Sequence, residues 1–147
     1  MKKGLLLGIL LSFGCPDETY YGMRHPRAVL APGVTHADNL RFATTCEVIG
    51  IYEPLPCNGI KAYSHDEDGT LREEWEVQTT NKPLPCPDVF TWGQDFGAAW
   101  EVLRTPLPLE RNRLYTLSTL SSYDLRERGL HFYIFDDGSI EASYFDG

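Results

Sequence analysis

The sequence predicts an all-β protein, an immunoglobulin-like β-sandwich of about seven to eight short antiparallel strands. Its core residues favour strands, because Phe, Tyr and Trp are numerous (7, 8 and 3) while Met occurs only twice. Runs of alternating apolar and polar residues are separated by Asp-Gly and Pro-containing turns. No segment carries a sustained helical period, and the short spacing between turns is typical of a sandwich.

The N-terminal segment has the composition of an export signal. Lys2 and Lys3 precede the uncharged run Gly4–Phe13, and Gly14 closes the run. A positive head, a short apolar stretch and a small residue predict a signal peptide over residues 1–14. The run is too short to cross a bilayer, which needs about 20 apolar residues. A buried N-terminal helix or strand is the structural alternative.

The end of this segment, Gly14-Cys15, resembles the lipobox of bacterial lipoproteins, in which the Cys becomes the lipid-modified first residue. Ser12 and Phe13 depart from that pattern, which favours Leu and then a small residue. The resemblance implies lipid attachment at Cys15 and a location on the periplasmic side of a bacterial membrane. Burial of the acyl chains would hold the protein there, at about 0.8 kcal/mol per CH₂.

The rest of the chain divides into a tether and a domain. Pro and Gly interrupt residues 15–41, so these residues are expected to form a flexible tether. Residues 42–147 are expected to form the sandwich. Its first strand begins near Phe42 and continues through the alternating residues up to Tyr52.

Two hairpins are the strongest local predictions. The runs Ile60–Ser64 and Leu71–Thr79 flank the turn Asp66–Gly69, and the runs Leu130–Phe135 and Ile140–Phe145 are joined by the turn Asp136–Ser139; each turn contains Asp-Gly. In the second arm of the first hairpin, alternation assigns one set of side chains to the core and the other to water. The expected inward set is Leu71, Glu73, Trp75, Val77 and Thr79, and the expected outward set is Arg72, Glu74, Glu76 and Gln78.

Shorter strands are expected between the hairpins. They span Asp88–Trp92, Ala98–Arg104, with Trp100 and Val102 inward, and Leu114–Leu120. Three Pro-Leu-Pro tripeptides separate the predicted strands and are interpreted as extended connectors.

The charge of the chain limits its partners. The formal net charge is −8, and without Lys2 and Lys3 the chain has 11 basic against 21 acidic residues. Such a surface repels phosphate backbones and favours cationic partners. The sequence therefore predicts no nucleic-acid binding.

Four cysteines suit an exported domain. A disulfide between Cys57 and Cys86 is favoured over a redox role, and would contribute about 3 kcal/mol by the loop-entropy model. Cys46 with Cys86 is the competing pair. The four His are scattered, and no Cys/His spacing predicts a metal site.

No motif predicts catalysis or a cofactor. There is no G-x-S-x-G elbow. The run Ser64–Gly69 has the acid density of a calcium loop, but Trp75 stands where the bidentate Glu belongs, so a hairpin turn is expected. The three Trp are expected in the core, although an aromatic sugar platform is the alternative. We therefore expect a binding protein and not an enzyme.

Several short motifs occur in the order found in one known family. They are Gly14-Cys15-Pro-Asp, a strand with Cys46, the segment Cys86–Gly93, Leu109–Tyr115 in an L-x-x-x-x-L-Y arrangement, and the closing Phe135–Gly138 turn. Together they resemble the type VI secretion immunity periplasmic lipoproteins of Gram-negative bacteria, although Cys57 departs from that pattern. The resemblance implies an anchored β-sandwich that binds and neutralises a toxin delivered into the periplasm.

Two loops are the candidates for partner binding. One is the acidic turn with Asp66, Glu67 and Asp68, and the other is the loop Tyr123–Gly129 with Arg126 and Glu127. An acidic loop suits a cationic toxin or enzyme as partner, because complementary fields speed association. A structural or assembly lipoprotein of the envelope, and a carbohydrate-binding module with exposed Trp, are the alternative functions.

Overall fold

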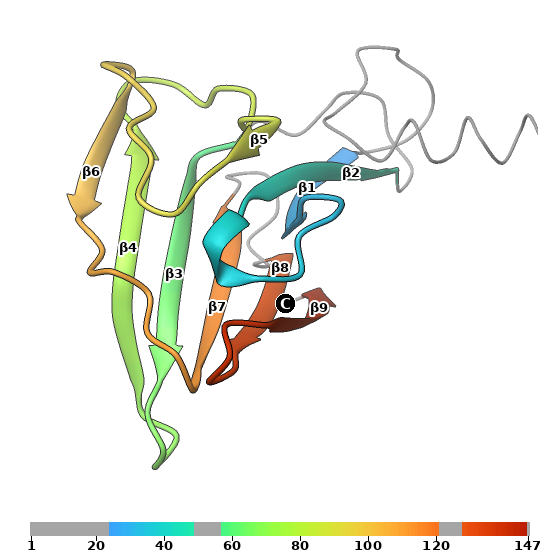
Figure 1. Ribbon diagram of the computed structural model, residues 1–147. Coiled ribbons are helices and arrows are strands. Elements are labelled where there is room, and N and C mark those ends of the chain that lie inside the picture. Colours follow the sequence, from blue (N-terminus) through green and yellow to red (C-terminus); the bar gives the residue numbers. More distant parts are fainter. Residues whose placement is uncertain (1–23, 49–56, 121–127, 147) are drawn as a thin grey trace, which may run out of the picture.

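The computed structural model describes residues 24–48, 57–120 and 128–146, and these form two antiparallel sheets (Figure 1). The small sheet has the strand order β1-β2-β5, and the large sheet has the order β6-β4-β3-β7-β8-β9. The strands are β1 (Arg24–Leu30), β2 (Phe42–Val48), β3 (Gly59–His65), β4 (Leu71–Thr79), β5 (Val89–Phe90), β6 (Trp100–Arg104), β7 (Arg113–Leu120), β8 (Arg128–Ile134) and β9 (Ile140–Asp146).

The predicted all-β class is confirmed, and so are both hairpins, β3–β4 and β8–β9. The described strands divide three and six, whereas an immunoglobulin constant-type domain divides its seven strands four and three. The only helical element among the described residues is a short 3-10 turn, Ala37–Asn39. No helix in the described part of the chain is long and apolar enough to cross a membrane.

The prediction that residues 15–41 form a flexible tether is wrong for residues 24–41. Strand β1 pairs with β2 along its whole length, from Arg24 opposite Val48 to Leu30 opposite Phe42. Ala28 is fully buried in the core. Proline is unfavourable in most strands, but β1 is an edge strand, where the missing N–H of Pro26 is tolerated. Residues 1–23, including the predicted signal peptide and Cys15, lie outside the described residues.

The predicted assignment of β4 side chains to the core and to water is wrong for the first half of the strand. The β3–β4 register shifts between Ala62 and Tyr63, which oppose Trp75 and Glu73, so Glu74 is an extra residue in β4. Such a β-bulge reverses the alternation beyond it. Leu71 is consequently exposed and Glu74 is buried.

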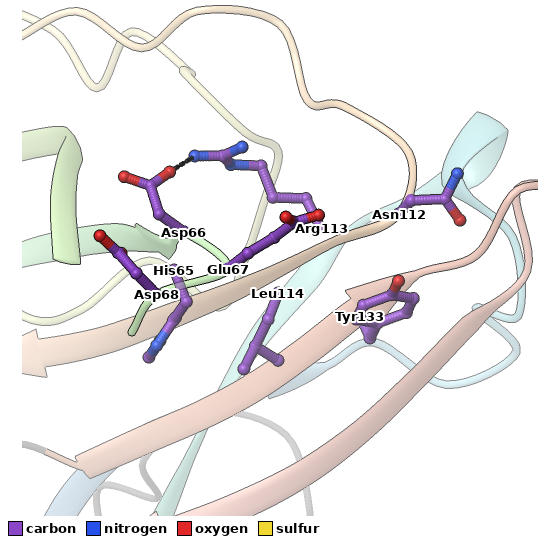
Figure 2. A pocket seen from close by; sticks show the side chains of 8 residues that line it. All are labelled: His65, Asp66, Glu67, Asp68, Asn112, Arg113, Leu114 and Tyr133. Carbon is purple, nitrogen blue, oxygen red and sulfur yellow. Dashed lines mark hydrogen bonds and ion pairs between the residues drawn. The ribbon is translucent and has the colours of Figure 1, made fainter. Parts of the chain in front are cut away.

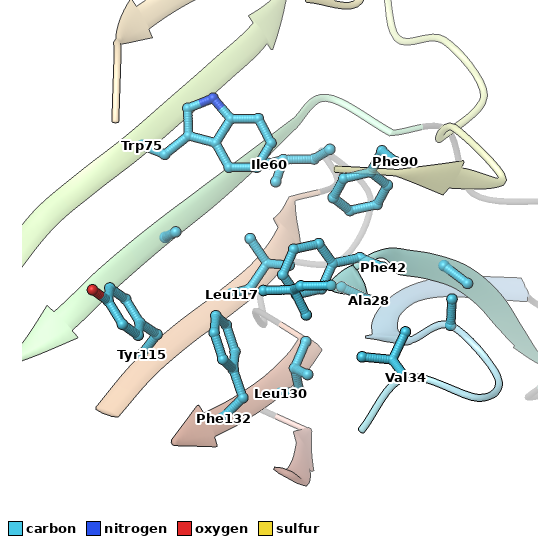
Figure 3. Close-up of a cluster of buried hydrophobic side chains, with 14 of the residues drawn as sticks. Ala28, Val34, Phe42, Ile60, Trp75, Phe90, Tyr115, Leu117, Leu130 and Phe132 are labelled. Atoms are coloured by element: carbon cyan, nitrogen blue, oxygen red, sulfur yellow. The ribbon is translucent and has the colours of Figure 1, made fainter. Parts of the chain in front are cut away.

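The core lies between the two sheets and is largely aromatic (Figure 3). Phe42 of β2 contacts Phe90 and Phe132, each with ring centroids 5.5 Å apart. Trp75 of β4 packs against Trp92, at 5.5 Å, from the loop that follows β5. Burying one such side chain contributes on the order of 2–3 kcal/mol. In the edge strand β6, Trp100 packs against Phe96, with ring centroids 5.3 Å apart, whereas Val102, also expected inward, is 51% exposed.

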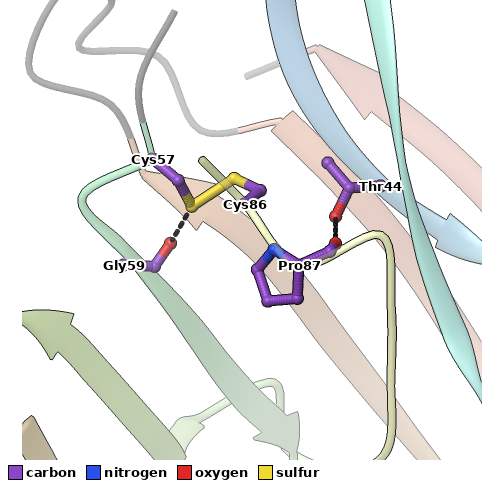
Figure 4. Close-up of a disulfide and its surroundings, with 5 residues drawn as sticks. All are labelled: Thr44, Cys57, Gly59, Cys86 and Pro87. Atoms are coloured by element: carbon purple, nitrogen blue, oxygen red, sulfur yellow. Dashed lines mark hydrogen bonds between the residues drawn. A yellow bond between two sulfur atoms is a disulfide. The ribbon is translucent and has the colours of Figure 1, made fainter. Parts of the chain in front are cut away.

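The predicted disulfide Cys57–Cys86 is present (Figure 4). The two Cα atoms are 5.0 Å apart, within the usual range for a bridge. Cys57 precedes β3 of the large sheet, and the segment after Cys86 is bound to the small sheet through Thr44, whose hydroxyl donates to the Pro87 carbonyl at 2.7 Å. The bridge therefore links the two sheets, and the alternative pair Cys46–Cys86 is excluded.

Candidate partner-binding site at one end of the large sheet

Two acidic hairpin turns lie at the same end of the large sheet. In β7, Leu114 pairs with His65, the last residue of β3, and Arg113 pairs with Ile134, the last residue of β8. The turns that follow His65 and Ile134 therefore flank the start of β7. Sequence alone does not bring them together, because about 70 residues separate them along the chain.

The first turn is closed by its own backbone and by Asp68. The Asp66 amide donates to the Thr70 carbonyl and the Gly69 amide to the Asp66 carbonyl, both at 2.9 Å. The Asp68 carboxylate accepts the Thr70 amide at 2.9 Å. This backbone hydrogen bond, followed by a bond with the Thr70 side chain, lowers the pKa of Asp68. Asp68 is therefore ionised at neutral pH and also holds the turn.

The side chains beside this turn line a pocket of about 670 Å³ (Figure 2). Arg113 lines this pocket, and only 17% of its side chain is exposed. It forms an ion pair with Asp66 and a second, at 3.6 Å, with Glu110. The lining residues are His65, Asp66, Glu67, Asp68, Asn112, Arg113, Leu114 and Tyr133.

Glu67 differs from its two acidic neighbours. Asp66 neutralises Arg113 and Asp68 caps the turn, whereas Glu67 is exposed and makes no ion pair or hydrogen bond with a described residue. Its carboxylate is thus available to a partner without loss of a contact within the protein.

The second turn adds acids to the same end. The Asp137 carboxylate accepts the Ser139 hydroxyl at 2.6 Å and the Ser139 amide at 2.9 Å, and these bonds lower the pKa of Asp137. The Asp136 carbonyl accepts Nη1 of Arg111 at 2.9 Å. Asn112 lines the first pocket and also a second pocket beside Asp136 and Asp137. Its backbone has a left-handed φ of 58°.

These turns define what we call the acidic rim. It has six acids, with Arg111 and Arg113 among them and Arg72 near enough to interact with Asp66 and Glu110, which leaves the end of the sheet negative. The acids are Asp66, Glu67, Asp68, Glu110, Asp136 and Asp137.

A histidine pair lies next to the rim, on the face of the large sheet that points away from the core. The Thr116 hydroxyl is 2.7 Å from Nε2 of His65 and 2.8 Å from Nδ1 of His131. Desolvation, and then the neighbouring His131, lowers the pKa of His65. The described residues contain no group of three or more His, Cys, Asp or Glu arranged to hold a metal ion.

The structure describes three of the five residues predicted to bind a partner. Asp66, Glu67 and Asp68 lie in the rim, as described above. Arg126 and Glu127 lie outside the described residues.

Sequence reasoning missed the basic and neutral side of the site. Arg113, Asn112 and Tyr133 join the acids only through strand pairing, and no local motif marks them. The alternative role of the Trp residues, an aromatic sugar platform, has no support at this end, because Trp75 is buried in the core and Trp92 packs against it. The Trp residues therefore have the structural role that the sequence favoured.

Comparison with known proteins returned no match: no family model, no curated protein and no solved structure is similar to this chain.

Proposed function

We propose that this chain is an exported, lipid-anchored immunity protein that neutralises a cationic toxin acting in the periplasm by binding it through the acidic rim. The observation that carries this proposal is the gathering of six acids from three separate segments at one end of the large sheet. A negative surface of this kind attracts a basic partner and speeds the encounter.

The disulfide supports the proposed location. Structural disulfides persist in oxidising compartments, so the Cys57–Cys86 bridge indicates a location outside the cytoplasm. Lipid attachment at Cys15 and the periplasmic side of the membrane are part of the proposal, and they rest on the sequence of the first fifteen residues.

The arrangement of the rim suits recognition without catalysis. Asp66 and Asp68 are held by Arg113 and by the Thr70 amide, so the turn is ordered before a partner arrives. An ordered surface loses less conformational entropy on binding. Glu67 then presents an uncompensated carboxylate to a basic group of the toxin.

The test is a pair of charge reversals, Glu67→Lys and Glu101→Lys. Both glutamates are exposed and have no ion pair with a described residue, but Glu101 pairs with Gln78 at the other end of the sheet. The toxin tested is the product of the adjacent open reading frame, exported to the periplasm of an indicator strain. We expect Glu67→Lys to abolish protection and to weaken binding about tenfold or more, since one lost charged contact corresponds to about 1.5–3 kcal/mol.

Glu101→Lys makes the same change in net charge and should protect like the unaltered protein. Binding should also weaken as ionic strength rises, because salt screens exposed charges. Equal protection by both variants would remove the rim from the interface. Failure of the unaltered protein to protect would contradict the immunity function itself.

A further inference from the structure

The four edges of the two sheets are not equally protected against pairing with another strand. The edge strand β1 contains Pro26, and the edge strand β5 has only two residues. The edge strand β6 has five residues and a register shift in its pairing with β4. Proline, short length and irregularity are the usual devices that block an edge.

The fourth edge, β9, has none of these devices. Its seven residues, Ile140–Asp146, pair with β8 in an unbroken register, and they include no Pro, Lys or Arg. A long, regular edge strand of this kind is a template for another strand.

One backbone contact shows which groups of β9 point outward. The Ile140 amide donates to the Thr35 carbonyl at 3.0 Å, so the Ile140 backbone faces away from β8. Because backbone direction alternates along an antiparallel strand, Ala142 and Tyr144 also face the outer edge, while Glu141 and Ser143 face β8.

Among the described residues, this edge has backbone partners only at its start. The segment Thr35–His36 covers Ile140 and Ser139, through the Thr35 bond and an antiparallel bridge between His36 and Ser139. No described residue pairs with the outward backbone groups of Ala142 or Tyr144. The five residues from Ala142 to Asp146 span about 17 Å, enough for a short strand.

The acidic residues near this edge favour a basic partner. Glu141 is exposed on β9 and has no described ion pair, Asp136 and Asp137 lie at the turn before it, and β9 has no basic residue. A second copy of this chain would bring the same acids together, in a chain whose net charge is already −8. Charge complementarity therefore favours a basic strand over a second copy.

We propose that the outer edge of β9, from Ala142 to Asp146, binds an extended basic segment of another protein by β-strand addition. The backbone groups of Ala142 and Tyr144 supply the hydrogen bonds, and Glu141 favours Lys or Arg in the added strand. The β9 backbone groups that carry this inference do not line the pocket beside Glu67, so the inference does not rest on the proposed immunity function, although Glu141 lies opposite Tyr133 of that pocket and Asp136 and Asp137 belong to the acidic rim.

The probe is a short synthetic peptide in which Lys alternates with Thr and Val, titrated into the protein and followed by amide NMR. Its control is the same peptide N-methylated at alternate residues, which keeps the charge but cannot pair. We expect the N-methylated peptide to bind about tenfold or more weakly, because two ordinary hydrogen bonds correspond to about that factor. Equal binding of the two peptides would overturn the inference.

Substitutions in β9 test the same contact by changing the protein instead of the peptide. Ala142→Pro removes an N–H that faces outward, so the β8–β9 ladder is retained while the probe binds more weakly. Ser143→Pro removes an N–H that faces β8 and should instead lower the melting temperature. Glu141→Gln should weaken binding of the probe and Glu101→Gln should not.

The peptide-free protein provides a measurement that does not depend on any variant. We expect the Ala142 and Tyr144 amides to exchange with solvent faster than those of Glu141 and Ser143. Slow exchange at Ala142 and Tyr144, a dimer in sedimentation, or undiminished binding by a folded Ala142→Pro variant would each overturn the inference.

Discussion

At the scale of single residues, Glu74 is the most unusual side chain of the large sheet. It is a carboxylate with only 5% of its side chain exposed, and it accepts the Ser64 hydroxyl at 2.7 Å and Nε of Arg72 at 2.9 Å. A buried charge is tolerated only when it is paired and hydrogen-bonded. Ser64 and Arg72 thus make it possible for Glu74 to occupy the bulge of β4.

We predict that Ser64→Ala destabilises the protein by about 1–3 kcal/mol, because it leaves the buried Glu74 carboxylate without one of its two donors. Urea denaturation measures the change. Ser143→Ala is the matched control, since Ser143 is exposed and its loss should change stability by less than about 0.5 kcal/mol. Equal effects of the two substitutions would contradict this role for Ser64.

His65 makes the stability dependent on pH. Because its pKa in the folded protein is lowered below the usual 6.5, the unfolded chain binds a proton more readily. This contribution is fully present above pH 6.5 and is lost as the pH falls through the lowered pKa. We predict a lower melting temperature at pH 5.5 than at pH 7.5, and a smaller difference in His65→Gln. An unchanged difference in that variant would assign the pH dependence to other groups.

At the scale of elements, the two hairpin turns have the same backbone requirement but different surroundings. Gly69 and Gly138 both have φ of 88°, a conformation that side chains disfavour. A Cβ at Gly69 would meet nothing within 4 Å, whereas one at Gly138 would lie 2.3 Å from the His36 ring. That ring is held by the Asp38 amide and the Asp137 carbonyl.

We predict that Gly69→Ala costs only the backbone strain, about 1–2 kcal/mol. Gly138→Ala should cost about 1–2 kcal/mol more, because His36 must move and lose its hydrogen bonds. Chemical denaturation of the two variants measures the difference. A cost for Gly69→Ala as large as that for Gly138→Ala would show that His36 does not hold the second turn.

At the scale of the whole molecule, the Cys57–Cys86 disulfide joins the two sheets across a separation of 29 residues. We predict that the double substitution Cys57→Ser, Cys86→Ser lowers the free energy of unfolding by about 3 kcal/mol, because the unfolded chain regains loop entropy. Denaturation with and without a reductant measures this. The reductant should destabilise the natural chain and leave the double variant unchanged, and any other result would contradict a structural role for the bridge.

The sequence by itself determined the features that depend on neighbouring residues. Turn dihedral angles are set by short motifs, so both Asp-Gly hairpins and the all-β class could be predicted. Alternation has a period of two residues, so the core positions of Trp75 and Val77 could also be predicted. The sequence favours the pair Cys57–Cys86, and the structure excludes the competing pair Cys46–Cys86.

Only the tertiary structure decided the features that depend on pairing between distant strands. The bulge at Glu74 reversed the faces of one half of β4, and β1 formed from residues expected to be a tether because β2 lies beside it. The acidic rim likewise exists because β7 lies between β3 and β8, which brings Arg113 beside Asp66. Strand register is a long-range property, and no local pattern in the sequence encodes which distant strand will be the neighbour.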